Sequence, residues 1–206
     1  MVLGRKPTAS EGNGNLVNFG ETLAYWYLRL NGFMPMRNFV LHRANIKAPQ
    51  SADTDLLAVR FPYVYEEIGG KAADWDHEAF AQWHLNLERA IILLVEVKTG
   101  GIAAEARWWR VPRICAAIRR LGIVDGAAAE RIAAELEHTS VLEIEAWVLA
   151  KLLVTNEPFP SETWLNLTLA EADAFIINRI RRYKDEKDAD RLRFPDELMQ
   201  YLAWKG

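Results

Sequence analysis

Two apolar runs, at residues 53–61 and 91–98, have the length and the bounds of buried strands. The second run reads Ile-Ile-Leu-Leu-Val-Glu-Val-Lys and is followed, one residue later, by two glycines. An unbroken apolar run of this length predicts burial on both faces of a sheet. Because side chains alternate between the two faces of a strand, Glu96 and Lys98 are expected on one face. A buried charge is costly unless it is paired or bound to a metal, so Glu96 requires a partner.

The rest of the chain alternates between helical and extended patterns. Asp125 is the expected cap of one helix, and the sequence Thr168-Leu169-Ala170-Glu171 is a capping box that opens another. The pattern predicts helices over residues 16–30, 76–88, 102–121 (broken or restarted at Pro112), 125–138, 168–183 and from 195, and extended segments over 33–41, 141–149 and 163–167. This order of elements predicts a mixed α/β sheet with a helical cover.

Composition places the chain among ordinary globular proteins. Its 206 residues suit one domain, with 50% hydrophobic and 26% charged residues. Cys115 is the single cysteine, which rules out an internal disulfide framework and a cysteine-based zinc site and indicates a reducing compartment. No apolar run approaches the length of a membrane span, and residues 1–15 are polar without a hydrophobic signal region. We therefore expect a cytoplasmic protein that does not engage a membrane.

Acidic residues stand at informative places in both predicted strands. Asp55 lies near the entrance of the first strand, and Glu96 and Lys98 lie near the end of the second. Two carboxylates on neighbouring strands, with a lysine two residues past one of them, suit a hard divalent cation and an activated water. The alternative is that Glu96 and Lys98 form a simple ion pair at the end of a sheet.

Three segments together resemble the PD-(D/E)XK nuclease superfamily, the restriction-endonuclease-like fold, and in particular its Holliday-junction resolvase-type members. These segments are the helix with Phe19-Gly20-Glu21, the strand Thr54-Asp55-Leu56-Leu57-Ala58, and the strand Glu96-Val97-Lys98. The resemblance covers about residues 16–121 and implies a mixed sheet flanked by helices. Residues 62–89 would be an insertion between the two metal-ligand strands. We expect a flexible leader at 1–14, a nuclease-like domain at 15–184, and a charged linker with an amphipathic helix at 185–206.

The resemblance also implies a chemistry. It predicts a deoxyribonuclease that hydrolyses phosphodiester bonds with Mg²⁺ or Mn²⁺ as cofactor. Asp55, Glu96 and the carbonyl of Val97 would bind the metal, and Glu21 would complete the acidic cluster through water or a second metal. Lys98 would orient the attacking water or act as its base, whereas Asp53 is a weaker candidate on the same strand. For Glu21, an exposed position on an otherwise buried helix is the alternative.

A DNA partner requires basic surface as well as acids. Arg107, Arg110 and Arg113 recur every three residues and would line one helix face if the helix continued through Pro112. Such a stripe suits phosphate contacts, and a solvated helix face is the alternative. The net charge of −3, from 25 basic and 28 acidic residues, does not indicate a nucleic-acid binder, although binding follows local charge.

A second class of function therefore competes with catalysis. A protein with this fold and no activity would bind nucleic acid or serve as a subunit in a DNA repair or defence complex. The amphipathic helix from residue 195 leaves open docking on the body of the domain, on a second copy in a homodimer, or in a larger complex.

Overall fold

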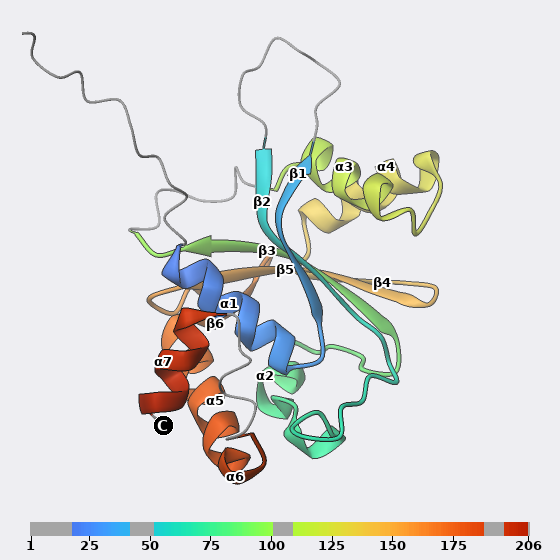
Figure 1. The fold of residues 1–206 in the computed structure, drawn as a ribbon. Helices are drawn as coiled ribbons and strands as arrows, with labels where there is room; N and C mark the ends of the chain where they lie inside the picture. Colours follow the sequence, from blue (N-terminus) through green and yellow to red (C-terminus); the bar gives the residue numbers. More distant parts are fainter. Residues whose placement is uncertain (1–17, 42–51, 101–108, 188–195, 206) are drawn as a thin grey trace, which may run out of the picture.

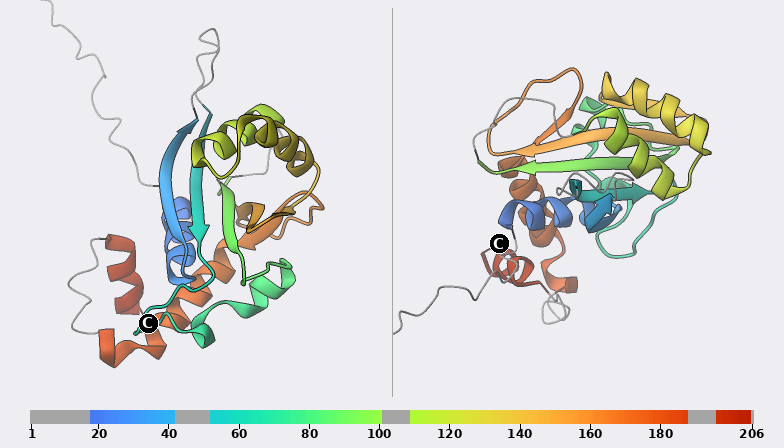
Figure 2. Two further views of the ribbon diagram at one scale, coloured as in Figure 1. Left: turned by 90° about the vertical axis from the view of Figure 1, so that its right-hand side faces the viewer. Right: turned by 90° about the horizontal axis from the view of Figure 1, so that it is seen from above.

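A computed structural model describes residues 18–41, 52–100, 109–187 and 196–205. These residues form a six-stranded mixed sheet with helices packed on both of its faces (Figure 1). The two further views in Figure 2 show the same three layers from the side and from above. None of the helices within the described ranges is long and apolar enough to cross a bilayer.

The sheet is built around β3, which runs from Ala90 to Lys98 between one antiparallel and one parallel neighbour. The strand order is β1-β2-β3-β5-β4. The remaining strand, β6, also pairs with β5 but stands outside this linear order. The other strands are β1 (Met34–Leu41), β2 (Ala52–Arg60), β4 (Val141–Ile144), β5 (Trp147–Thr155) and β6 (Leu165–Thr168). Every residue of β3 from Ala90 to Val97 is buried, as its apolar run predicts.

One face of the sheet is covered by α1 (Phe19–Leu30), α2 (His77–Gln82), α5 (Leu169–Arg182) and α7 (Glu197–Lys205). Alternate β3 residues, among them Leu93 and Val95, pack there against apolar side chains of these helices. Residues 62–89 belong to this layer as well, because Trp75, Phe80 and Trp83 are buried in the same core. The short α6 (Lys184–Lys187) follows α5.

The opposite face is covered by α3 (Val111–Leu121) and α4 (Gly126–Glu137). Ile92 and Leu94 of β3 point to this side, and so by alternation do Glu96 and Lys98. Asp125 caps α4 by accepting a hydrogen bond from the Ala128 N–H at 2.8 Å, as predicted. The capping box at the start of α5 is also confirmed.

Two expectations about local structure are wrong. Residues 141–149 form a hairpin of β4 and the start of β5, because Glu145, with φ of 48°, reverses the chain between them. A tight turn without Gly or Asn leaves the hydrophobic alternation almost undisturbed, so the pattern predicts a single strand. In the region 76–88 only α2 is helical, since His84 adopts φ of 53° and the Leu85 N–H donates back to the Phe80 carbonyl. Helix ends of this type usually carry Gly, and here the signal is absent.

Candidate active site

The predicted acidic residues Asp55 and Glu96 come close to each other at the point where β2 and β3 stop pairing. The backbone ladder between these strands ends at the pair Leu56 and Val95. Beyond it, Asp55 Oδ2 accepts a hydrogen bond from the Val97 N–H at 2.7 Å, so a side chain takes the place of the next backbone partner. This bond fixes the Asp55 carboxylate beside the backbone that carries Glu96 and Lys98.

Lys98 lies between the two carboxylates of the neighbouring strands. Its Nζ is 2.7 Å from Glu96 Oε1 and 3.8 Å from Asp55 Oδ2. The Glu96 side chain is almost fully buried, whereas about a third of the Lys98 side chain reaches solvent. The structure therefore brings together the three residues that the sequence predicted, on the face of the sheet that α3 and α4 cover.

The other carboxylate oxygen of Glu96 faces α3. Arg113 Nη2 lies 3.4 Å from Glu96 Oε2, and its guanidinium carbon is 4.5 Å from the centre of the buried Trp109 ring. This ion pair joins residues 17 apart in the sequence. Nothing in the spacing of Arg113 predicts a contact with Glu96, so the sequence did not reveal it.

Glu21 approaches the site from the first turn of α1, which lies beside the end of β3 (Figure 1). Gly20 permits this approach, because a Cβ there would collide with the Thr99 side chain. Asn18 caps the helix through the Gly20 N–H and also donates to Glu21 Oε1 at 3.0 Å. Asn18 was not among the residues predicted for the site, although Asn before a helix is a common capping signal.

Glu21 interacts electrostatically with the acidic residues of the strands. Partial burial and the charge of Asp55 raise the pKa of Glu21, against the opposing effects of Asn18, Arg37 and Lys98. Burial and then Asp55 also raise the pKa of Glu96, while Lys98 and Arg113 favour its ionised form. Carboxyl groups whose pKa is raised by a neighbouring carboxylate are a feature of functional sites and a reason to expect a cation.

The oxygen atoms available at this site are of the chemical type that a hard divalent cation binds. The carboxylates of Asp55 and Glu96 and the carbonyl of Val97 are the oxygen ligands that Mg²⁺ and Mn²⁺ prefer. In the described part of the chain, no three or more His, Cys, Asp or Glu side chains are grouped so that they could hold a metal ion. A cation bound by Asp55 and Glu96 would have to compete with the ammonium of Lys98.

The predicted arginine stripe takes a different form. Arg107 lies outside the described residues, and α3 begins only at Val111. Arg110 is the N-cap residue, exposed, and 3.7 Å from Glu137 Oε1, whereas Arg113 points to Glu96. Arg110 and Arg113 therefore do not share a helix face. Pro112 stands in the first turn, where a proline starts a helix rather than interrupting it.

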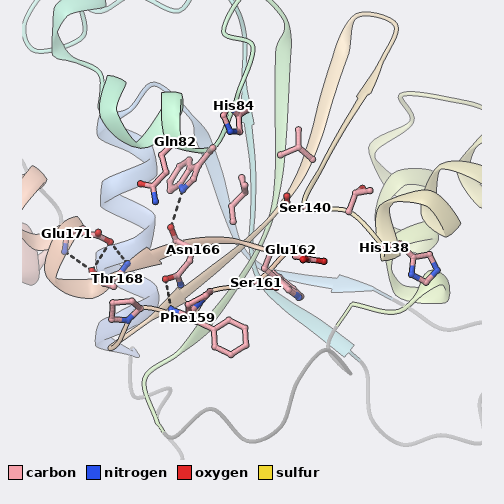
Figure 3. Close-up of a pocket in the computed structure, with 17 residues that line it drawn as sticks. Gln82, His84, His138, Ser140, Phe159, Ser161, Glu162, Asn166, Thr168 and Glu171 are labelled. Atoms are coloured by element: carbon pink, nitrogen blue, oxygen red, sulfur yellow. Dashed lines mark hydrogen bonds between the residues drawn. The ribbon is translucent and has the colours of Figure 1, made fainter.

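A pocket of about 590 Å³ lies apart from these residues, at the edge of the sheet formed by β4 and β6 (Figure 3). None of the four predicted catalytic residues lines it. Asn166 stabilises the wall of this pocket, since its Nδ2 donates to the Leu153 carbonyl at 3.1 Å and its Oδ1 accepts from the Phe159 N–H at 2.8 Å.

The side chain of Asp53, the weaker acidic candidate, lies outside the described set.

Comparisons with protein-family models, with curated proteins and with solved structures found no match for this chain.

Proposed function

We propose that this protein is a Mg²⁺-dependent nuclease of the restriction-endonuclease-like fold that hydrolyses phosphodiester bonds of DNA. The observation that carries the proposal is the convergence of Asp55, Glu96 and Lys98 where two strands part, with Glu21 close enough for Asp55 to raise its pKa. These residues come from three separate segments of the chain. A simple ion pair at a sheet end needs only Glu96 and Lys98.

Asp55, Glu96 and the Val97 carbonyl are the proposed metal ligands, with Glu21 contributing through water. A divalent cation bound there would neutralise phosphate charge and lower the pKa of a bound water. The ammonium of Lys98 would stabilise the negative charge that develops on the attacking water. The Lys98 ammonium lies between the carboxylates and is partly open to solvent, so it can reach both the proposed metal ligands and a water molecule. Arg107 and Arg110 remain the proposed phosphate contacts.

The competing proposal is an inactive nuclease fold that binds nucleic acid or serves as a complex subunit. One specific observation favours it: Glu96 is paired through both of its oxygens, to Lys98 and to Arg113. A carboxylate held in this way can be a structural ion-pair centre. In such a protein, divalent cations would have no effect on stability.

Incubation with plasmid, linear, single-stranded and branched DNA separates the two proposals. Each substrate is tested with Mg²⁺, with Mn²⁺ and with a chelator, and Asp55→Asn protein purified in parallel controls for contaminating nucleases. We expect cation-dependent cleavage of at least one substrate by the wild type and none by the variant. Equal cleavage by both proteins, or intact DNA throughout, would favour the inactive fold.

A further inference from the structure

Glu96 is held from two sides by cations that come from different elements. Lys98, two residues along the same strand, contacts Oε1 at 2.7 Å, and Arg113 of α3 lies 3.4 Å from Oε2. Lys98 alone already supplies one counter-charge for this buried carboxylate. Arg113 is therefore a second counter-ion, and it stands on the other oxygen.

The position of Arg113 is not explained by the helix that carries it. It lies in the first turn of α3, which contains no acid, and Arg110 is the N-cap residue of the same helix. The positive end of the helix dipole disfavours cations there. Contact with Glu96 and packing on Trp109 both favour the observed place of the guanidinium.

We infer that Arg113 is a displaceable counter-ion of Glu96. In the cation-free protein it stabilises the buried carboxylate, and it gives up Oε2 when a divalent cation binds. This inference rests on the proposed function, because it requires Glu96 to be a metal ligand. Arg113 is then a positioning residue that competes with the cation, rather than part of a stripe that follows phosphates.

Competition has a signature that a merely structural ion pair does not share. If Arg113 and the cation exclude each other on Oε2, removing the guanidinium must weaken the cation-free fold and strengthen cation binding together. If the guanidinium only maintained the geometry of the site, its removal would lower both the stability of the cation-free fold and the affinity for the cation. The opposite signs of the two effects distinguish the roles without any measurement of DNA cleavage.

The test compares Arg113→Met, Arg113→Gln and Arg113→Lys with wild type by Mn²⁺ titration calorimetry and by thermal melting in chelator, both without DNA. We expect Arg113→Met and Arg113→Gln to melt at lower temperature and to bind Mn²⁺ about 10-fold more tightly, within the usual range for coupled sites. Arg113→Lys keeps the charge but loses the planar group that packs on Trp109, so its Mn²⁺ affinity should lie between those of wild type and Arg113→Gln. Arg119→Met, which breaks an exposed ion pair between α3 and Glu130 of α4, should match wild type in Mn²⁺ affinity.

The outcomes separate the two claims. Unchanged or weaker Mn²⁺ affinity in Arg113→Gln, in a protein whose wild type binds Mn²⁺ through Asp55, would overturn the inference and leave the proposed function standing. If Arg113→Met does not fold, Arg113→Gln alone decides between the two roles, because it retains much of the length and polarity of the side chain. Absence of Mn²⁺ binding by the wild type would overturn both.

Discussion

Replacing Lys98 by Met removes the ammonium and keeps the apolar stem of the side chain. The ammonium lies 2.7 Å from Glu96 Oε1, and Glu96 is only 4% exposed. Removal of one partner from a buried ion pair typically costs about 3–5 kcal/mol. Because Arg113 still faces Glu96 and the Lys98 side chain is 31% exposed, we expect a smaller loss of unfolding free energy, about 1–2 kcal/mol.

The effect on catalysis should be far larger than the effect on stability. If Lys98 stabilises the attacking water, its loss should slow single-turnover cleavage by roughly 100-fold or more, with Mn²⁺ and DNA still bound. Lys151→Met is the matched control, because it makes the same chemical change on the adjacent strand β5, where Lys151 donates to the Glu137 carbonyl, away from the site acids. Single-turnover rates and melting temperatures are measured on the same preparations. A Lys98→Met protein that cleaves at the wild-type rate, however unstable, refutes the catalytic role.

Two further predictions concern Lys151 and Glu21. Burial lowers the pKa of Lys151 to about 8 from 10.5, so the unfolded state binds more protons between these values and the wild-type fold should gain stability as the pH rises from 8 to 10.5. Lys151→Met should lack this gain and be more stable than wild type at pH 7 by up to about 3 kcal/mol, since each pKa unit corresponds to about 1.4 kcal/mol. Urea unfolding of both proteins across this pH range measures the difference in their stability. A difference that does not change with pH would show that Lys151 is not the titrating group. Glu21→Gln keeps the hydrogen bond from Asn18 and removes the charge, so we expect a loss of activity of about 10- to 100-fold, less than for Asp55 or Glu96 variants. Wild-type turnover of that variant at saturating Mg²⁺ would exclude Glu21 from the site.

The central features of the sheet were predictable because they depend on local pattern. The apolar run of β3 predicted a strand buried on both faces, and alternation along it placed Glu96 and Lys98 on one side. Asp125 and Thr168 predicted helix starts through capping, which involves only neighbouring residues.

The features that were missed depend on contacts between distant segments or on unusual backbone angles. Arg113 reaches Glu96 only because α3 packs across β3, and its spacing to Arg110 predicted a shared helix face instead. The turns at His84 and Glu145 place ordinary side chains at positive φ, where a sequence normally signals a turn with Gly or Asn. The meeting of Asp55 with the Val97 N–H requires the two strands to separate, which no single strand encodes.

The proposal that Asp55 and Glu96 bind a divalent cation is tested most directly by Mn²⁺ titration calorimetry of Asp55→Asn beside wild type. Asn keeps an oxygen that can accept the Val97 N–H, so the strands stay joined while one negative charge is lost. We predict saturable Mn²⁺ binding by the wild type and affinity reduced by at least about 100-fold in the variant, as expected for loss of a carboxylate ligand to a hard cation. Equal affinity of the two proteins for Mn²⁺ would contradict the assignment of this site.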